Sequence, residues 1–198
     1  MPKIVDHDQR RKAIGAAAMK VIAERGLEAT KLVDIARLAG VTTGAVTHYF
    51  SDKDAILMAA LEMAYDTMFA SMERVKEEEN YSFLDIISKA LPTTEESSIA
   101  MTVWLAFWSR SIAEPRVAKL QLEFHHRWQN IVSQELIRHY QRHKIPLPKD
   151  LDDVSQGITA QVNGLIIRGL VDRPDWPASR LHNSLRVYLE QIGIQILL

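Results

Sequence analysis

The chain has 198 residues, of which 47% are hydrophobic, and a formal net charge of −1. Its length and apolar content suffice for a sizeable core, and its near-neutral charge argues against a protein that coats nucleic acid over its whole surface. Cysteine is absent, which excludes disulfides and thiolate metal sites. The sequence has no apolar run near the roughly 18 residues of a membrane span and no signal-peptide pattern, so we expect a soluble cytoplasmic protein.

The first predicted helix runs from about Asp8 to Gly26. Apolar residues recur along it at i, i+3, i+4 and i+7, and Gly26 is a natural stop. Arg10, Arg11 and Lys12 stand at its beginning, where the helix dipole disfavours cations. Either a solvated run of charges or a nearby DNA backbone would explain them.

Two short helices joined by a tight turn are predicted between Thr30 and Lys53. In the first, Ile35 and Ala36 belong to an inward apolar stripe, whereas Asp34 is expected to face water. Gly40 follows where a sharp reversal requires positive φ. The pattern indicates a helical hairpin.

The second short helix is predicted to begin after Thr42, which can accept its free amide hydrogens. Val46 and Phe50 form an inward pair four residues apart. A helix of about seven residues is unstable alone, so packing must present its polar face to a partner. That face carries Thr43, Thr47 and His48.

The start of the next helix offers a place for phosphate. Ser51 and Asp54 have the spacing of a capping box, and Lys53 lies in the first turn, so amides and a cation would meet there. Residues 1–53 contain nine Lys or Arg against six Asp or Glu, and the remainder contains 15 against 19. The basic end of the chain therefore coincides with the predicted hairpin.

The hairpin resembles the helix-turn-helix of the TetR family of bacterial repressors. The matching residues are Ile35-Ala36, Ala39-Gly40-Val41, Tyr49-Phe50 and Lys53. We expect Thr43, Thr47 and His48 to read base edges of a double-stranded operator, and the resemblance implies phosphate contacts nearby. The candidate DNA-binding residues are Thr42, Thr43, Gly44, Thr47, His48, Tyr49 and Lys53.

The rest of the chain predicts more helices and no convincing strand. A long helix over 55–75 would join the two halves, and a box at Thr93 and Glu96 would open a later one. We expect an all-α fold of about nine helices, with a DNA-binding domain at 1–53 and an effector-binding and dimerisation domain at 54–198. The later helices are predicted at 82–91, 93–113, 117–142, 151–170 and 176–198.

A group of aromatic residues in the later helices has two readings. It can be core packing, or it can be a pocket, because aromatic faces attract quaternary ammonium ions. Asp66 is a further acidic residue that could stand nearby. The candidate ligand-binding residues are Tyr65, Phe69, Trp104, Phe107, Trp108, Glu123 and Trp128.

Enzymatic and metal sites find little support. Glu123 and His126 form a single Glu-x-x-His pair, whereas a di-iron bundle needs two such pairs and two further glutamates. No H-E-x-x-H, G-x-S-x-G or glycine-rich phosphate loop occurs. We expect no enzyme, no cofactor and no metal.

The C-terminal part resembles the BetI-type branch of the TetR family, which responds to choline. The resemblance rests on Trp104–Trp108, Pro115, Leu120-Gln121, Asn163-Gly164-Leu165 and Arg168, although Ile166-Ile167 stands where that branch tends to carry Trp. It implies a homodimer that pairs through its last two helices. The candidate interface residues are Gly157, Gln161, Gly164, Leu165, Leu185, Tyr188, Leu189 and Ile192.

Together these patterns predict a homodimeric transcriptional repressor that binds a pseudo-palindromic operator and is released by a small-molecule effector, such as choline or another cation. The alternative is a helical ligand-binding or interaction module that does not bind DNA.

Overall fold

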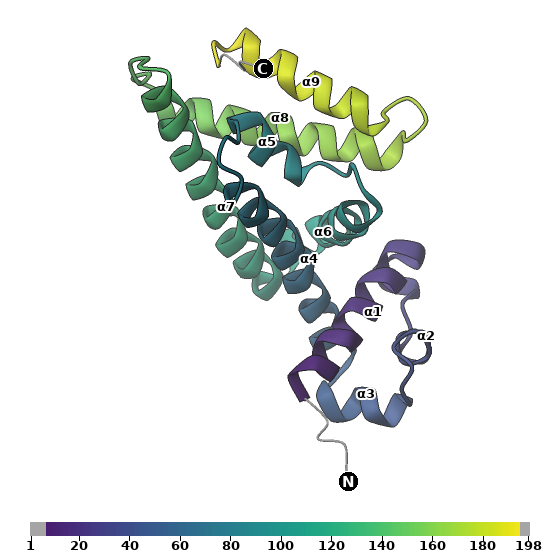
Figure 1. Ribbon diagram of the computed structural model, residues 1–198. Helices are drawn as coiled ribbons and strands as arrows, with labels where there is room; N and C mark the ends of the chain where they lie inside the picture. Colours follow the sequence, from purple (N-terminus) through teal and green to yellow (C-terminus); the bar gives the residue numbers. More distant parts are fainter. Residues whose placement is uncertain (1–6, 195–198) are drawn as a thin grey trace.

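The computed structural model describes residues 7–194. Within this range the chain forms nine α-helices, one short 3₁₀ helix and no strand, which confirms the predicted all-α fold (Figure 1). The helices are α1 (His7–Ala29), α2 (Leu32–Leu38), α3 (Thr43–Tyr49), α4 (Lys53–Lys76), α5 (Phe83–Ile87), the 3₁₀ helix η1 (Ser88–Ala90), α6 (Glu95–Ala113), α7 (Pro115–Arg142), α8 (Leu151–Val171) and α9 (Ala178–Gln191).

The first three helices form a small unit at one end of the molecule (Figure 1). Gly40 has φ 65° in the turn between α2 and α3, a conformation that side chains with a Cβ disfavour. The Thr42 hydroxyl then accepts the Ala45 N–H at 3.1 Å and caps α3. Both expectations for this hairpin are confirmed.

The Asp34 carboxylate corrects one expectation about the hairpin. Asp34 is 8% exposed, whereas it was expected to face water. It accepts hydrogen bonds from Arg25 of α1, at 2.7 Å, and from Arg37 one turn later in α2. A carboxylate buried with two cations is satisfied, and it fastens α2 to the end of α1.

Helix α4 connects this unit to the larger helical body. It packs against both α1 and α6, and buried side chains continue from one end of the molecule to the other. It is also 24 residues long with a mean hydropathy of 1.2 over its most apolar window, so it meets the length and composition of a membrane span, contrary to the expectation above. More than half of that window is buried inside the fold, as in the core helix of a globular protein.

Two helix caps lie one residue after the predicted positions. Asp52, not Ser51, caps α4, and its carboxylate accepts the Ala55 N–H at 2.7 Å. At α6 the capping box is formed by Thr94 and Ser97, one position after the predicted pair. In both cases a competing acceptor lies next to the predicted one, and periodicity alone does not choose between neighbours.

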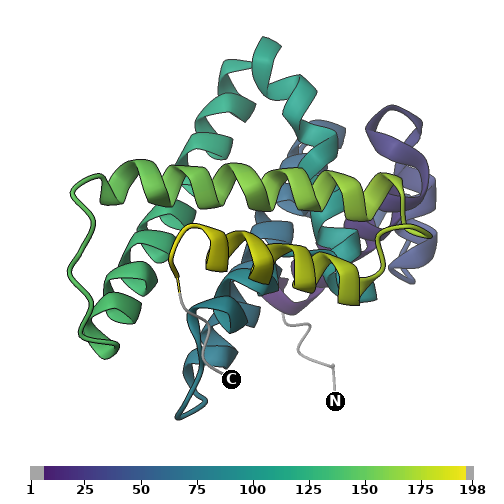
Figure 2. The ribbon, with the colours of Figure 1, turned by 90° about the horizontal axis from the view of Figure 1, so that it is seen from above.

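Helices α8 and α9 lie side by side as an antiparallel hairpin in both views (Figures 1 and 2). Helix α9 is shorter than predicted and ends at Gln191, because Gly193 takes φ 85°. Residues 195–198 of the predicted last helix lie outside the described range.

Candidate functional site

The polar face of α3 is open to solvent. Thr43, Thr47 and His48 are all exposed, while Val46 and Phe50 are 0% and 3% exposed against the core. The Thr47 hydroxyl donates to the Gly44 carbonyl oxygen at 3.1 Å. A seven-residue helix is thus held from behind and presents three side chains outward.

The residues flanking α3 surround this face. Thr42 and Gly44 are exposed, and Tyr49 and Lys53 are half-buried, with the Lys53 ammonium 3.4 Å from the Glu28 carbonyl oxygen. One residue missing from the candidates fixes the end of α3. Arg11 of α1 donates to the Tyr49 carbonyl oxygen at 2.9 Å and lies 4.5 Å from the Phe50 ring centroid.

A cavity of about 370 Å³ lies in the helical body, lined by residues of α4, η1, α6, α7 and α8. Four of the predicted ligand-binding residues line it: Tyr65, Trp104, Trp108 and Trp128. The Trp104 and Trp108 rings meet edge to face with centroids 5.5 Å apart. We call this space the aromatic cavity.

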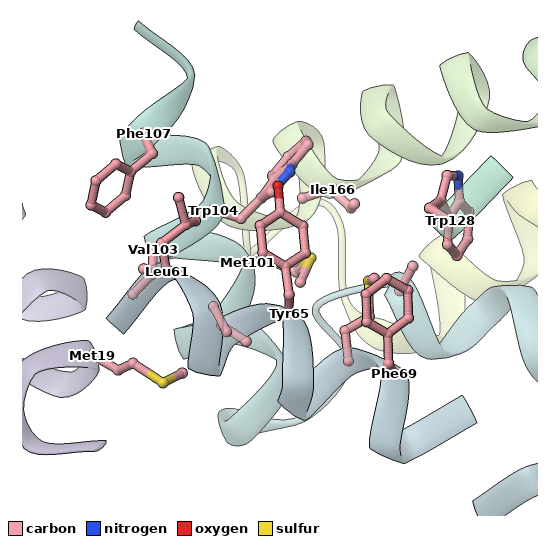
Figure 3. Close-up of a cluster of buried hydrophobic side chains, with 14 of the residues drawn as sticks. Met19, Leu61, Tyr65, Phe69, Met101, Val103, Trp104, Phe107, Trp128 and Ile166 are labelled. Carbon is pink, nitrogen blue, oxygen red and sulfur yellow. The ribbon is translucent and has the colours of Figure 1, made fainter. Parts of the chain in front are cut away.

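Three predicted ligand-binding residues do not line the aromatic cavity. Phe107 is fully buried and points away from Tyr65 on the other side of α6 (Figure 3). Phe69 is covered by the Arg127 guanidinium, 3.9 Å from its ring centroid. Glu123 is exposed and faces Lys119 at 3.9 Å. Asp66 is also exposed. Residues three or four apart share a helix face, so the packing of neighbouring helices decides these placements.

Other lining residues were missed among the candidates. The most prominent is Phe124 of α7, which stacks on Tyr65 with ring centroids 3.7 Å apart. Its position four residues before Trp128, on the same helix face, is a signal that could have found it. Met68 and Met101 also line the cavity, and both line a second hollow of about 320 Å³ as well.

The lining of the aromatic cavity carries no fixed charge. Among the described residues that line it, none is Asp, Glu, Lys or Arg. Burial raises the pKa of the Tyr65 phenol, so it stays protonated and donates to the Gln121 side-chain oxygen. Burial, with a smaller contribution from His126, lowers the pKa of His125. The cavity is therefore aromatic, weakly polar and neutral at neutral pH.

An ion-pair group joins α6 to the start of α4. The Arg110 guanidinium, on α6, donates to Asp54 in the first turn of α4 at 2.8 Å and to Glu114 at 2.6 and 2.7 Å. These bonds lower the pKa of the Glu114 carboxyl. Helix α6 thus carries both cavity residues and the contact with the start of α4.

The predicted dimer residues divide into two groups. Leu165, Leu185 and Leu189 are at most 3% exposed within a single chain, because they pack α8 and α9 together. They are therefore unavailable to a second copy, which corrects the expectation that they lie in the dimer interface. Gly164 is exposed, and Gly157, Gln161, Tyr188 and Ile192 are half-buried. The exposed small and apolar residues of α8 follow helical spacing: Ala160, Gly164, Ile167 and Val171. We call these four residues the α8 stripe.

Comparison with known proteins agrees with this arrangement. Residues 14–60 match the model of "Bacterial regulatory proteins, tetR family", and residues 82–193 match "BetI-type transcriptional repressor, C-terminal". The HTH-type transcriptional regulator BetI of Burkholderia cenocepacia is 30% identical over 173 residues, which cover 85% of this chain and 86% of that protein.

Solved structures share the whole fold. A transcriptional regulator from Rhodococcus sp. Rha1 is 26% identical with a TM-score of 0.80 and covers 95% of this chain and 99% of its own. A transcriptional regulator from Saccharomonospora viridis in complex with choline is 22% identical with a TM-score of 0.82 and covers 96% and 100%. The chain belongs to the TetR family of transcriptional regulators and is of the BetI type.

Proposed function

We propose that this regulator is a homodimeric repressor, working in the cytoplasm, that binds a pseudo-palindromic operator and releases it when a quaternary ammonium effector such as choline enters the aromatic cavity. The observation that carries the proposal is the double role of α6. One helix supplies Trp104 and Trp108 to the cavity and Arg110 to the ion pair with Asp54 at the start of α4. A ligand that moves α6 would therefore move α4, the helix that follows α3 in the chain.

The DNA side of the proposal assigns α3 to the major groove. The exposure of Thr43, Thr47 and His48 supports base-edge contacts, and Thr42, Tyr49 and Lys53 would fix the helix on phosphates. In a twofold dimer the two copies of α3 would be about 34 to 36 Å apart, one helical turn of DNA. We assign this role to a domain made of residues 1–53 and the effector and dimer roles to residues 54–198.

The effector side rests on the chemistry of the cavity. Its volume is at the small end of the roughly 300–1,000 Å³ typical of ligand sites. Its indole and phenol rings attract cations without a carboxylate, and desolvation strengthens that attraction. The choline complex of the Saccharomonospora viridis regulator, which has the same fold, supports choline as the first compound to try.

The dimer side rests on the α8 stripe. Ile167 and Val171 are 43% and 76% exposed, and nothing lies within 4 Å of the space that a Gly164 side chain would fill. An apolar stripe with a glycine allows another helix to approach closely. We therefore assign the interface to the stripe and to the half-buried Gly157, Gln161, Tyr188 and Ile192.

The proposal is tested with DNA from upstream of the protein's own gene. Fluorescence anisotropy should show binding at nanomolar to micromolar protein and release on addition of choline. Trp104→Phe, which keeps an aromatic ring but lacks the indole, should raise the choline concentration needed, while Trp176→Phe, a substitution outside the cavity, should not. Choline binding without any operator binding would instead support the ligand-binding module.

A further inference from the structure

The Gln121 side-chain amide is hydrogen-bonded through its oxygen but not through its nitrogen. Its oxygen accepts the Tyr65 hydroxyl, and its nitrogen, Nε2, is buried without a hydrogen-bond acceptor among residues 7–194. Two other buried side-chain atoms in that range lack partners, on Gln129 and His139, and neither residue lines the aromatic cavity. Buried N–H groups are rarely left unpaired, so the unused amide requires an explanation.

The orientation of this amide follows from its neighbours. In Figure 3 the Trp104 indole nitrogen lies beside the Tyr65 phenol oxygen. An indole N–H can only donate, so Trp104 offers no acceptor for the Tyr65 hydrogen. The Tyr65 hydroxyl therefore needs the oxygen of Gln121. The amide nitrogen is consequently turned away from Tyr65.

Other polar groups of the lining are already occupied or open to water. The Thr159 hydroxyl accepts the Trp128 indole N–H and donates to Gln129, both at 2.8 Å. The Ser111 hydroxyl donates to the Trp108 carbonyl oxygen at 2.6 Å. Asn163 and His125 also line the cavity, but neither has a buried polar side-chain atom that lacks a hydrogen-bond partner. Gln121 is thus the described lining residue whose side chain carries a buried donor without a partner.

We propose that the Gln121 amide nitrogen donates to an oxygen of the effector, so that the cavity selects small quaternary ammonium compounds that carry a hydroxyl or carbonyl oxygen close to the ammonium group. This inference rests on the proposed function and adds the oxygen-bearing group of the ligand to its ammonium group. A neutral oxygen suits the site better than a carboxylate, because no Lys or Arg among the described lining residues would compensate a buried anion.

The test compares three ligands of similar size on the full-length protein by isothermal titration calorimetry. Ethyltrimethylammonium is choline without its hydroxyl, and glycine betaine carries a carboxylate. We expect choline to bind about tenfold tighter than ethyltrimethylammonium, the effect of one hydrogen bond to a buried donor, and tighter than betaine. Gln121→Leu should remove the preference by weakening choline alone.

Two further variants make the outcome decisive. Gln134→Leu is the matched control, because Gln134 is exposed on the same helix, and it should keep the preference. Tyr65→Phe keeps the ring but frees the amide to rotate, so it should lower the preference even if Gln121→Leu does not fold.

Three results would overturn the inference: equal binding of choline and ethyltrimethylammonium by the wild type, equal weakening of both by a folded Gln121→Leu, or tightest binding of betaine. If both ammonium compounds bind equally and still release the operator, only this inference is lost. If neither binds, the proposed effector class is lost with it.

Discussion

Replacing Arg110 by Gln tests whether the cavity and the DNA-binding helices are coupled through α6. The side chain is 19% exposed, and its partner Asp54 is 43% exposed. A hydrogen bond between charged groups contributes about 1.5–3 kcal/mol when buried, and the exposure of Asp54 reduces this to about 1 kcal/mol. A loss of that size corresponds to a factor of about five in an equilibrium.

The quantity to measure is the ratio of operator affinities without and with saturating choline. If Arg110 transmits the change, the ratio should shrink about fivefold in Arg110→Gln. Lys119→Gln is the control, because its ion pair with Glu123 lies between side chains that are 80% and 60% exposed. Asp54→Asn should reproduce the effect, and the double variant should add little to it.

An unchanged ratio in a folded Arg110→Gln protein that still binds choline and operator would reject this route of coupling. So would an equal loss in Lys119→Gln. If the Arg110 and Asp54 substitutions changed the affinity ratio additively, the two residues would act independently and not through their ion pair.

Three further predictions address the other parts of the proposal. Thr47→Ala should cost about 1–3 kcal/mol on the operator and relax base discrimination, whereas Lys53→Ala should weaken binding to all DNA and flatten its salt dependence, as anisotropy titrations would show. Val171→Asp should give monomers in light scattering, while Leu147→Asp, at a loop residue 47% exposed, should not. The lowered pKa of His125 keeps its ring neutral at pH 7.5. Protonation as the pH falls below its ordinary value of about 6.5 should weaken choline binding about fivefold, and His125→Gln should remove this dependence in calorimetry.

The helical elements were readable from the sequence because their signals are local. Gly40 and Thr42 mark a turn and a cap through their own backbone and side-chain chemistry. Cap positions were less certain, since Asp52 and Ser51 offer the same kind of acceptor one residue apart. Boundaries of this kind depend on loop geometry that periodicity does not encode.

The site was only partly readable, because it depends on packing between distant segments. Trp104 and Phe107 lie three residues apart on α6, yet one lines the cavity and the other is core. Leu185 and Leu189 form a periodic apolar stripe that could equally face a second chain or α8. Asp34 appeared solvent-facing because its partner Arg25 belongs to the preceding helix. Such pairings appear only when the helices are placed together.

For the proposed function, the uncharged lining of the aromatic cavity predicts that effector binding and operator binding respond differently to dissolved ions. Counterions compete directly with side chains for DNA phosphates, so operator affinity drops steeply as ionic strength rises. A cation held among indole and phenol rings would be screened much less. In the proposed repressor, added salt would therefore weaken operator binding and leave effector binding nearly constant. The same effector concentration would then release more operators in a saltier solution.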